Sequence, residues 1–117
     1  MKVAVEWKLF LTYLLALFLL VCSTSAFAQI TVIHFNAGFN AANDAVWFSK
    51  LQECDRQTLL IEQNDNQTKY EIAVVPTIVV FDDGEEVKRF QADISFKMVA
   101  TRKEVQEYID ELIISKF

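Results

Sequence analysis

The first 28 residues contain one long apolar run instead of the periodic pattern of a folded domain. Lys2 and Lys8 flank a short charged start, and residues 9–21 are almost entirely apolar. Residues 26–28, Ala-Phe-Ala, then give the small-x-small pattern that signal peptidase accepts. We therefore expect a signal peptide over residues 1–28, cleaved after Ala28, and a mature protein that is exported to the periplasm or secreted.

An uncleaved membrane anchor is the alternative for the same segment. Residues 9–28 are 20 residues long, about the length at which a helix spans a bilayer. The polar residues 23–25, Ser-Thr-Ser, interrupt the far end of this stretch, which favours cleavage over anchoring. A membrane is therefore expected as a partner only if this segment is retained.

The rest of the chain alternates short β-branched runs with stretches of helical spacing. Residues 30–35, Ile-Thr-Val-Ile-His-Phe, predict a buried strand, and residues 58–62 and 77–81 predict two more. Residues 82–84, Asp-Asp-Gly, predict a turn, after which residues 86–90 can return as the hairpin partner. The pattern therefore predicts strands at four places, the last two of them adjacent in sequence.

A helix is predicted directly after the first strand. Gly38 breaks the strand, Asn40 is a good N-cap, and the helix should run from Ala41 to Cys54. Within this range, Trp47, Leu51 and Cys54 fall on one apolar stripe that would face the core.

Two further helices are predicted nearer the C-terminus. The polar residues 63–67 lead into one or two helical turns that end near Tyr70. Thr101 caps a final helix, and Glu104 three residues later completes a capping box. The buried face of this helix is predicted from its 3.6-residue apolar spacing, with Val105, Tyr108, Ile109, Leu112 and Ile113.

The order of these elements predicts the fold class. A strand, helix and strand in succession imply a right-handed parallel crossover, and the closing hairpin adds antiparallel strands to the same sheet. We therefore expect a single α/β domain over residues 29–117, with a mixed four-stranded sheet between helices on both faces.

Charge and cysteine content restrict the possible partners. Residues 29–117 carry 9 of the 11 basic and 15 of the 16 acidic side chains, a net charge of −6, because only Lys2, Lys8 and Glu6 precede them. This balance disfavours nucleic acid as a partner. Cys22 lies in the predicted signal peptide, so Cys54 remains alone in the mature chain and no intramolecular disulfide can form.

Two local sequences resemble the active-site segments of the thioredoxin family. Residues 35–43, Phe-Asn-Ala-Gly-Phe-Asn-Ala-Ala-Asn, are similar to the family's Phe-x-Ala-x-Trp-Cys-x-x-Cys. Phe39 stands in the tryptophan place, and Asn40 and Asn43 stand in the two cysteine places. Residues 74–77, Val-Val-Pro-Thr, followed by Phe-Asp-Asp-Gly-Glu, are similar to the family's proline loop and hairpin.

This resemblance covers about residues 30–115 and implies a thioredoxin-like three-layer α/β/α sandwich with a cis peptide bond before Pro76. The strand and helix that precede this core in full-length thioredoxins have no counterpart in it. The resemblance also implies a groove in which thioredoxins hold extended peptides as an added strand. The candidate binding residues are those that would form this groove: Phe39, Asn40, Ala41, Ala42, Asn43, Val75, Pro76 and Thr77.

The two asparagines remove the chemistry of dithiol exchange. That chemistry needs a thiolate at a helix N-terminus and a second thiol three residues later. Helix capping is enough to explain Asn40, and an amide is no useful nucleophile. We therefore expect no catalytic residue, cofactor or metal, and a protein or peptide as the partner. His34, in the place of the family's buried acid, is expected to be a hydrogen-bonded core side chain, with a pH sensor as the alternative.

Cys54 carries the main alternative function, a single-thiol redox protein. A core role is favoured because the end of the predicted helix and the adjacent Glu53 and Asp55 would raise the pKa of its thiol. A second alternative is a membrane-anchored structural subunit that keeps residues 1–28. Four acidic residues near the predicted turn most simply solvate it, with weak cation binding as the alternative: Asp82, Asp83, Glu85 and Glu86.

Overall fold

The structure of the protein is a computed structural model that describes residues 29–117. The predicted signal peptide over residues 1–28, its cleavage after Ala28 and the alternative anchor lie outside these residues. None of the helices formed by residues 29–117 has the length and apolar content needed to cross a membrane.

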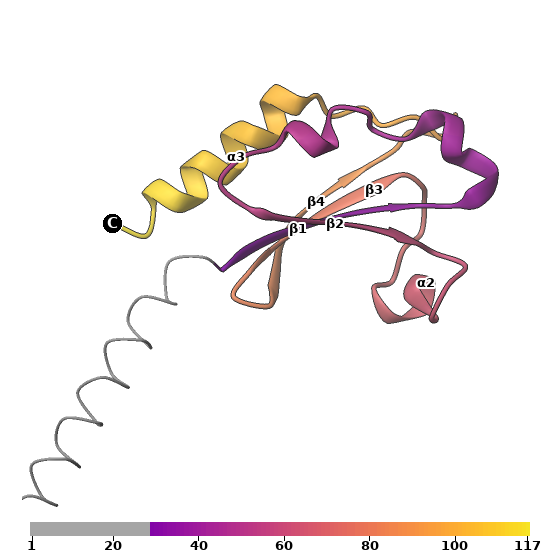
Figure 1. The fold of residues 1–117 in the computed structure, drawn as a ribbon, viewed down its shortest axis with the longest axis horizontal. Coiled ribbons are helices and arrows are strands. Elements are labelled where there is room, and N and C mark those ends of the chain that lie inside the picture. The colour runs from indigo at the N-terminus through magenta and orange to yellow at the C-terminus, as the bar shows by residue number, and fades with distance from the viewer. Residues whose placement is uncertain (1–28) are drawn as a thin grey trace, which may run out of the picture.

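A mixed sheet of four strands forms the centre of the domain, as the sequence pattern predicts (Figure 1). Its strands are β1 (Ile30–Asn36), β2 (Asp55–Leu60), β3 (Thr77–Asp82) and β4 (Glu85–Gln91). They lie in the order β2-β1-β3-β4. β1 pairs in parallel with β2 and antiparallel with β3, and β4 is antiparallel to β3.

Helical segments cover both faces of this sheet. The helix α3 (Arg102–Ile114) and the segment between β1 and β2 lie over one face, and the short helix α2 (Asn66–Lys69) lies beyond the other (Figure 1). Successive residues of β1 point to opposite faces, so Val32 packs with the core beneath α3 while Ile33 and Phe35 pack with the core on the α2 side. The central strand is therefore buried on both faces, which explains its nearly continuous apolar sequence.

The predicted helix over residues 41–54 is wrong. This segment instead forms two short 3₁₀ helices, η2 (Gly38–Asn43) and η3 (Phe48–Lys50), and the chain is extended again at Leu51. Asp44 breaks the helix with extended dihedral angles (φ −56°, ψ 141°). Its carboxylate accepts a hydrogen bond from the Asn36 side chain, and the next amide, that of Ala45, donates to the His34 ring. These contacts with β1 outweigh the helical preference of the segment.

The remaining elements agree with the pattern except at their ends. The second strand begins at Asp55 and ends at Leu60, earlier at both ends than the predicted range 58–62, because the predicted helix before it is absent. The hairpin turn is formed by Asp83 and Gly84, both with positive φ (56° and 83°), as two-residue hairpin turns require.

The C-terminal helix is confirmed. The Thr101 hydroxyl accepts a hydrogen bond from the Glu104 amide, but the Glu104 carboxylate faces that hydroxyl instead of the Thr101 amide, so only half of the predicted capping box forms. Val105 and Ile109 are fully buried. The other predicted apolar positions of this helix pack against the same core while partly exposed: Tyr108, Leu112 and Ile113.

Candidate functional site

The two segments that resemble thioredoxins lie side by side at one end of the sheet. β1 ends at Asn36 and leads into η2, while residues 74–76 lead into β3, the antiparallel neighbour of β1. The side-chain nitrogen of Asn40 (Nδ2) lies 3.5 Å from the Val75 carbonyl oxygen, across 35 residues of sequence. The peptide bond between Val75 and Pro76 is cis, as the resemblance implies.

Asn40 is the centre of a buried polar network and not the helix cap that its sequence position suggests. Only 4% of its surface is exposed, and it lies inside η2 with non-helical angles (φ −112°, ψ 18°). The N-cap of η2 is Ala37, without a side-chain cap. The Asn40 side-chain nitrogen donates to the Asn36 Oδ1 and the Phe96 carbonyl, each at 3.0 Å. The capping prediction therefore fails because tertiary partners compete for the same amide.

The remaining polar atoms of this network are satisfied within the loop. Asn43, half-buried, donates from its side chain to the Asn40 Oδ1 at 2.8 Å. Asn36 donates to the Asn40 carbonyl at 2.9 Å and to the Asp44 carboxylate. Asn40 and Asn43, which the sequence resemblance aligns with the two cysteines, are thus bonded to each other, and Asn40 connects three separate segments of the chain.

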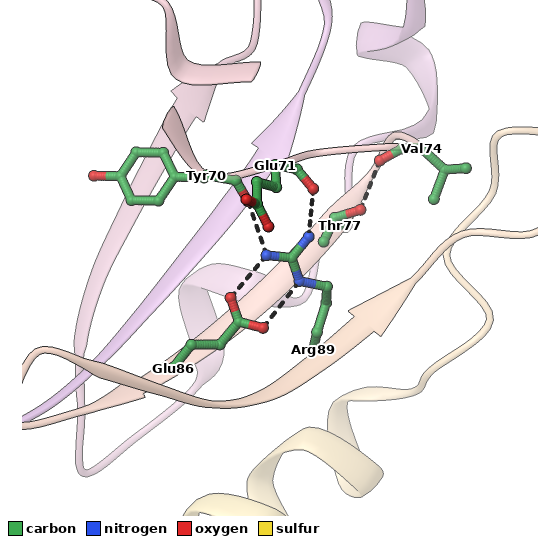
Figure 2. A network of polar contacts seen from close by, with 6 residues as sticks. All are labelled: Tyr70, Glu71, Val74, Thr77, Glu86 and Arg89. Atoms are coloured by element: carbon green, nitrogen blue, oxygen red, sulfur yellow. Dashed lines mark hydrogen bonds and ion pairs between the residues drawn. The ribbon is translucent and has the colours of Figure 1, made fainter. Parts of the chain in front are cut away.

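The candidate binding residues differ widely in exposure. Phe39 is 76% exposed, and Ala41 and Ala42 are also exposed. In contrast, the side chains of Val75, Pro76 and Thr77 are buried, and the Thr77 hydroxyl donates to the Val74 carbonyl at 2.6 Å (Figure 2). A ligand at this site could therefore contact Phe39 and the two alanines through their side chains, but Val75 only through its backbone.

The backbone of Val75 has spare hydrogen-bonding capacity. Its amide has no hydrogen-bond partner among the described residues. Its carbonyl accepts only the 3.5 Å contact from Asn40, at the far limit of a hydrogen bond. Because the Asn40 amino group has two hydrogens and two shorter bonds, to Asn36 and Phe96, it contributes little to this carbonyl.

A second loop, which the sequence pattern did not indicate as part of the site, lies beside Phe39 and Asn40. Residues 92–101 join β4 to α3 and carry Ile94, 99% exposed, and Phe96, 45% exposed. The Phe96 ring packs edge-on against Phe39, with ring centroids 5.7 Å apart. Asp93 shapes the loop by accepting from Ser95, and these hydrogen bonds lower the pKa of its carboxyl. The available signal was the four large apolar residues in a loop between a strand and a helix: Ile94, Phe96, Met98 and Val99.

Arg89 on β4 holds the segment that precedes the cis peptide bond (Figure 2). Its guanidinium donates to the backbone carbonyls of Tyr70 and Glu71, at 2.8 Å and 2.7 Å. The same group forms a two-point contact with the Glu86 carboxylate, at 2.7 Å and 3.2 Å. One side chain therefore fastens the end of α2 to the sheet, a few residues before Val75.

His34 is a buried, hydrogen-bonded side chain, as predicted. Only 2% of it is exposed, and its Nε2 accepts a hydrogen bond from the Ala45 amide at 3.3 Å. Burial lowers the pKa of His34, and the negative charge of Asp44 opposes this shift only in part. The ring is therefore held in its neutral form near neutral pH.

Cys54 is a free thiol that, like Trp47, packs against the core beneath α3, although it does not lie on a helix. Burial raises the pKa of this thiol; Arg56 opposes the rise, and Asp55 and Glu53 add to it. The predicted direction is right, but the helix end invoked for it is absent and burial is the main cause. Among residues 29–117, no cluster of His, Cys, Asp and Glu side chains is arranged to hold a metal ion.

Comparison with known proteins defines the fold. No family model and no curated protein matches the sequence. Solved structures do match. A thioredoxin mutant from Halobacterium salinarum shares 16% identity over 74% of this chain and 77% of its own, with a TM-score of 0.57. The Schistosoma mansoni thioredoxin pre-protein shares 19% over 80% and 88%, at 0.57. Fasciola hepatica thioredoxin shares 22% over 82% and 92%, at 0.52.

These matches, together with the mixed sheet and the cis proline, show that the chain has a thioredoxin-like α/β fold. At these identities the likeness concerns the fold alone. What the site does must therefore be argued from its own residues.

Proposed function

We propose that residues 29–117 form an exported, non-catalytic domain that binds an extended segment of a protein partner beside the cis proline. The observation that carries this proposal is the backbone of Val75. Val75 as a whole is only 4% exposed, and an amide without a partner in such a residue costs free energy. An extended peptide would supply the missing acceptor while donating to the Val75 carbonyl. Such pairing adds a strand through backbone hydrogen bonds.

Exposed aromatic side chains beside Val75 support the same proposal. We name Phe39, Ile94 and Phe96 the aromatic surface. Aromatic and aliphatic side chains exposed together are typical of interaction sites, and Asn40 fixes this surface by bonding to the Phe96 carbonyl. The peptide backbone would pair with Val75, and its alternate side chains would pack on the aromatic surface.

Catalysis by thiols finds no support at this site. Asn40 and Asn43 stand where the thioredoxin family has its cysteines, and Cys54 is the only cysteine among the described residues. Its thiol is partly buried and its pKa is raised, whereas reactive cysteines have lowered pKa values. A single-thiol enzyme is therefore the weaker proposal.

Binding of the full-length protein to an array of short unstructured peptides tests the proposal. Phe39→Ala and Phe96→Ala should each weaken the strongest interactions about tenfold, the effect of losing one central aromatic contact. Ile114→Ala is the matched control, because Ile114 is an equally exposed apolar residue (71%) on α3. Equal losses in all three variants, or none, would contradict the aromatic surface.

Backbone methylation of a bound peptide tests the strand pairing separately. Single peptide N–H groups are replaced by N-methyl groups, one position at a time. Methylation at the residue that faces Val75 should abolish binding, whereas methylation at the residue before or after it should be tolerated, because only every second residue of an edge strand bonds to its neighbour. A peptide that tolerates methylation at every position would refute pairing with Val75.

A further inference from the structure

A cavity separate from the aromatic surface opens beside β1 and β2. Its volume is about 250 Å³, and it lies where the chain between η2 and η3 is not helical. The sequence pattern predicts a continuous helix over residues 41–54, and such a helix would cover this part of the sheet. The observed chain forms two short 3₁₀ helices instead. The side chains that give the cavity its chemistry are His34, Asp44, Phe48, Ser49, Arg56 and Thr58.

His34 presents a hydrogen-bond donor to this cavity. Because its Nε2 accepts from the Ala45 amide, the neutral ring carries its hydrogen on Nδ1. No described residue forms a hydrogen bond with Nδ1. In contrast, every fully buried side-chain nitrogen or oxygen among the described residues has a hydrogen-bond partner. Nδ1 is therefore not fully buried, and the His34 ring forms part of the cavity lining.

Arg56 brings an unpaired positive charge to the same place. The parallel register aligns Arg56 with Val32 and Thr58 with His34, so these four residues share one face of the sheet. The Arg56 guanidinium donates to the Leu51 carbonyl, and none of the described acidic side chains forms an ion pair with it. The net charge of −6 disfavours anions in general, but a guanidinium without an ion-pair partner beside a cavity favours an anionic ligand at that point.

We propose that this cavity binds a small monocarboxylate, held by the Arg56 guanidinium and the His34 Nδ1–H group. The Ser49 and Thr58 hydroxyls supply further donors, and the Phe48 ring supplies apolar surface for a short hydrocarbon group. Asp44 on the same lining disfavours a second negative charge, which selects a carboxylate over a phosphate dianion. This site does not depend on peptide binding at the aromatic surface.

Nuclear magnetic resonance on the full-length protein tests the proposal. His34 is the sole histidine, so its ring signals are unambiguous. Sodium acetate, added at constant ionic strength against sodium chloride, should shift these signals to saturation. Arg56→Gln should weaken this binding about tenfold, because it removes a charge-assisted hydrogen bond. Arg102→Gln, at an exposed arginine outside this lining, should leave it unchanged.

Three results would overturn the carboxylate site. They are a His34 shift that does not saturate, equal binding in the Arg56→Gln variant, and tighter binding of inorganic phosphate than of acetate. If Arg56→Gln does not fold, Thr58→Val keeps the shape of the strand and removes one donor. Weaker acetate binding in Thr58→Val would support the site, and unchanged binding would overturn it.

Discussion

Replacing Asn40 by alanine should destabilise the domain far more than a typical loop substitution. Asn40 donates to the Asn36 Oδ1 and the Phe96 carbonyl, and it accepts from Asn43. Asn36 is only 1% exposed, so Asn40→Ala leaves its Oδ1 without its donor and without water. An unsatisfied buried polar group costs about 1–3 kcal/mol. Loss of the Phe96 bond adds about 1 kcal/mol.

The free energy of unfolding should therefore fall by about 2–4 kcal/mol in Asn40→Ala. Domains of this size are stable by about 5–15 kcal/mol in total, so the change is easily measured. Urea unfolding of the full-length chain, followed by circular dichroism and extrapolated linearly to water, gives the value.

Asn43→Ala provides the matched control, because it is the same substitution three residues away in the same 3₁₀ helix. Asn43 is half-buried and its side chain makes a single hydrogen bond, to Asn40. Its loss takes one donor from the buried Asn40 Oδ1, so the expected cost is about 1–2 kcal/mol, less than for Asn40→Ala, which also removes the bonds to Asn36 and Phe96. Equal destabilisation of the two variants would refute the role of Asn40 as the centre of the network.

Four further predictions concern other parts of the domain. Arg89→Lys should lower the free energy of unfolding by about 1–3 kcal/mol in urea, because the three donors on one lysine nitrogen cannot replace the four hydrogen bonds of the planar Arg89 guanidinium; an unchanged midpoint would contradict this. Burial lowers the pKa of His34 below its ordinary 6.5, so the unfolded chain binds the proton more readily, and stability should be full above pH 6.5 and decrease as the pH falls below it. His34→Gln should flatten that dependence, and an equally steep profile would argue against it. Cys54 should react slowly with iodoacetamide at pH 7 and rapidly after denaturation, whereas fast reaction of the folded protein would revive the single-thiol enzyme. The double variant Asn40→Cys and Asn43→Cys should reduce insulin disulfides poorly, as turbidity would show, because no helix N-terminus lowers the thiol pKa there; thioredoxin-like turnover would contradict this.

Sequence reasoning succeeds here where local pattern and tertiary packing agree. The apolar spacing of residues 105–113 identifies the buried face of α3, because every apolar side chain of that face packs against the core beneath it. Residues 77–84 likewise carry both the strand pattern and the glycine that the hairpin turn requires. In each case the signal lies within a short window of the chain.

The helix predicted over residues 41–54 fails because its competitors lie outside that window. Asn36 and His34, on β1, bond to Asp44 and Ala45 and hold them away from helical geometry. The spacing of Trp47 and Cys54 still reflects burial, since both pack against the core. Periodicity therefore indicated which side chains are buried, while the backbone that buries them was decided by long-range hydrogen bonds.

The candidate site shows the same division. The resemblance to thioredoxins predicts that residues 39–43 and 75–77 lie close together. It does not predict which of them are exposed, because burial of Asn40 and Thr77 depends on what packs over them. Phe96 could not be predicted as a site residue, because it contacts Phe39 across more than 50 residues of sequence. Its loop has no counterpart among the motifs that carried the resemblance.

The asparagine in the first cysteine place does more than remove a thiol. Asn40 uses its donors on Asn36 and Phe96 and its acceptor on Asn43, and a cysteine has neither a second donor nor a carbonyl with which to do this. Asn40 therefore has a structural role, and its bond to the Phe96 carbonyl helps to hold Phe96 beside Phe39. The cis proline, the unpaired Val75 amide and the aromatic surface beside it are the features on which the proposed binding of an extended chain rests.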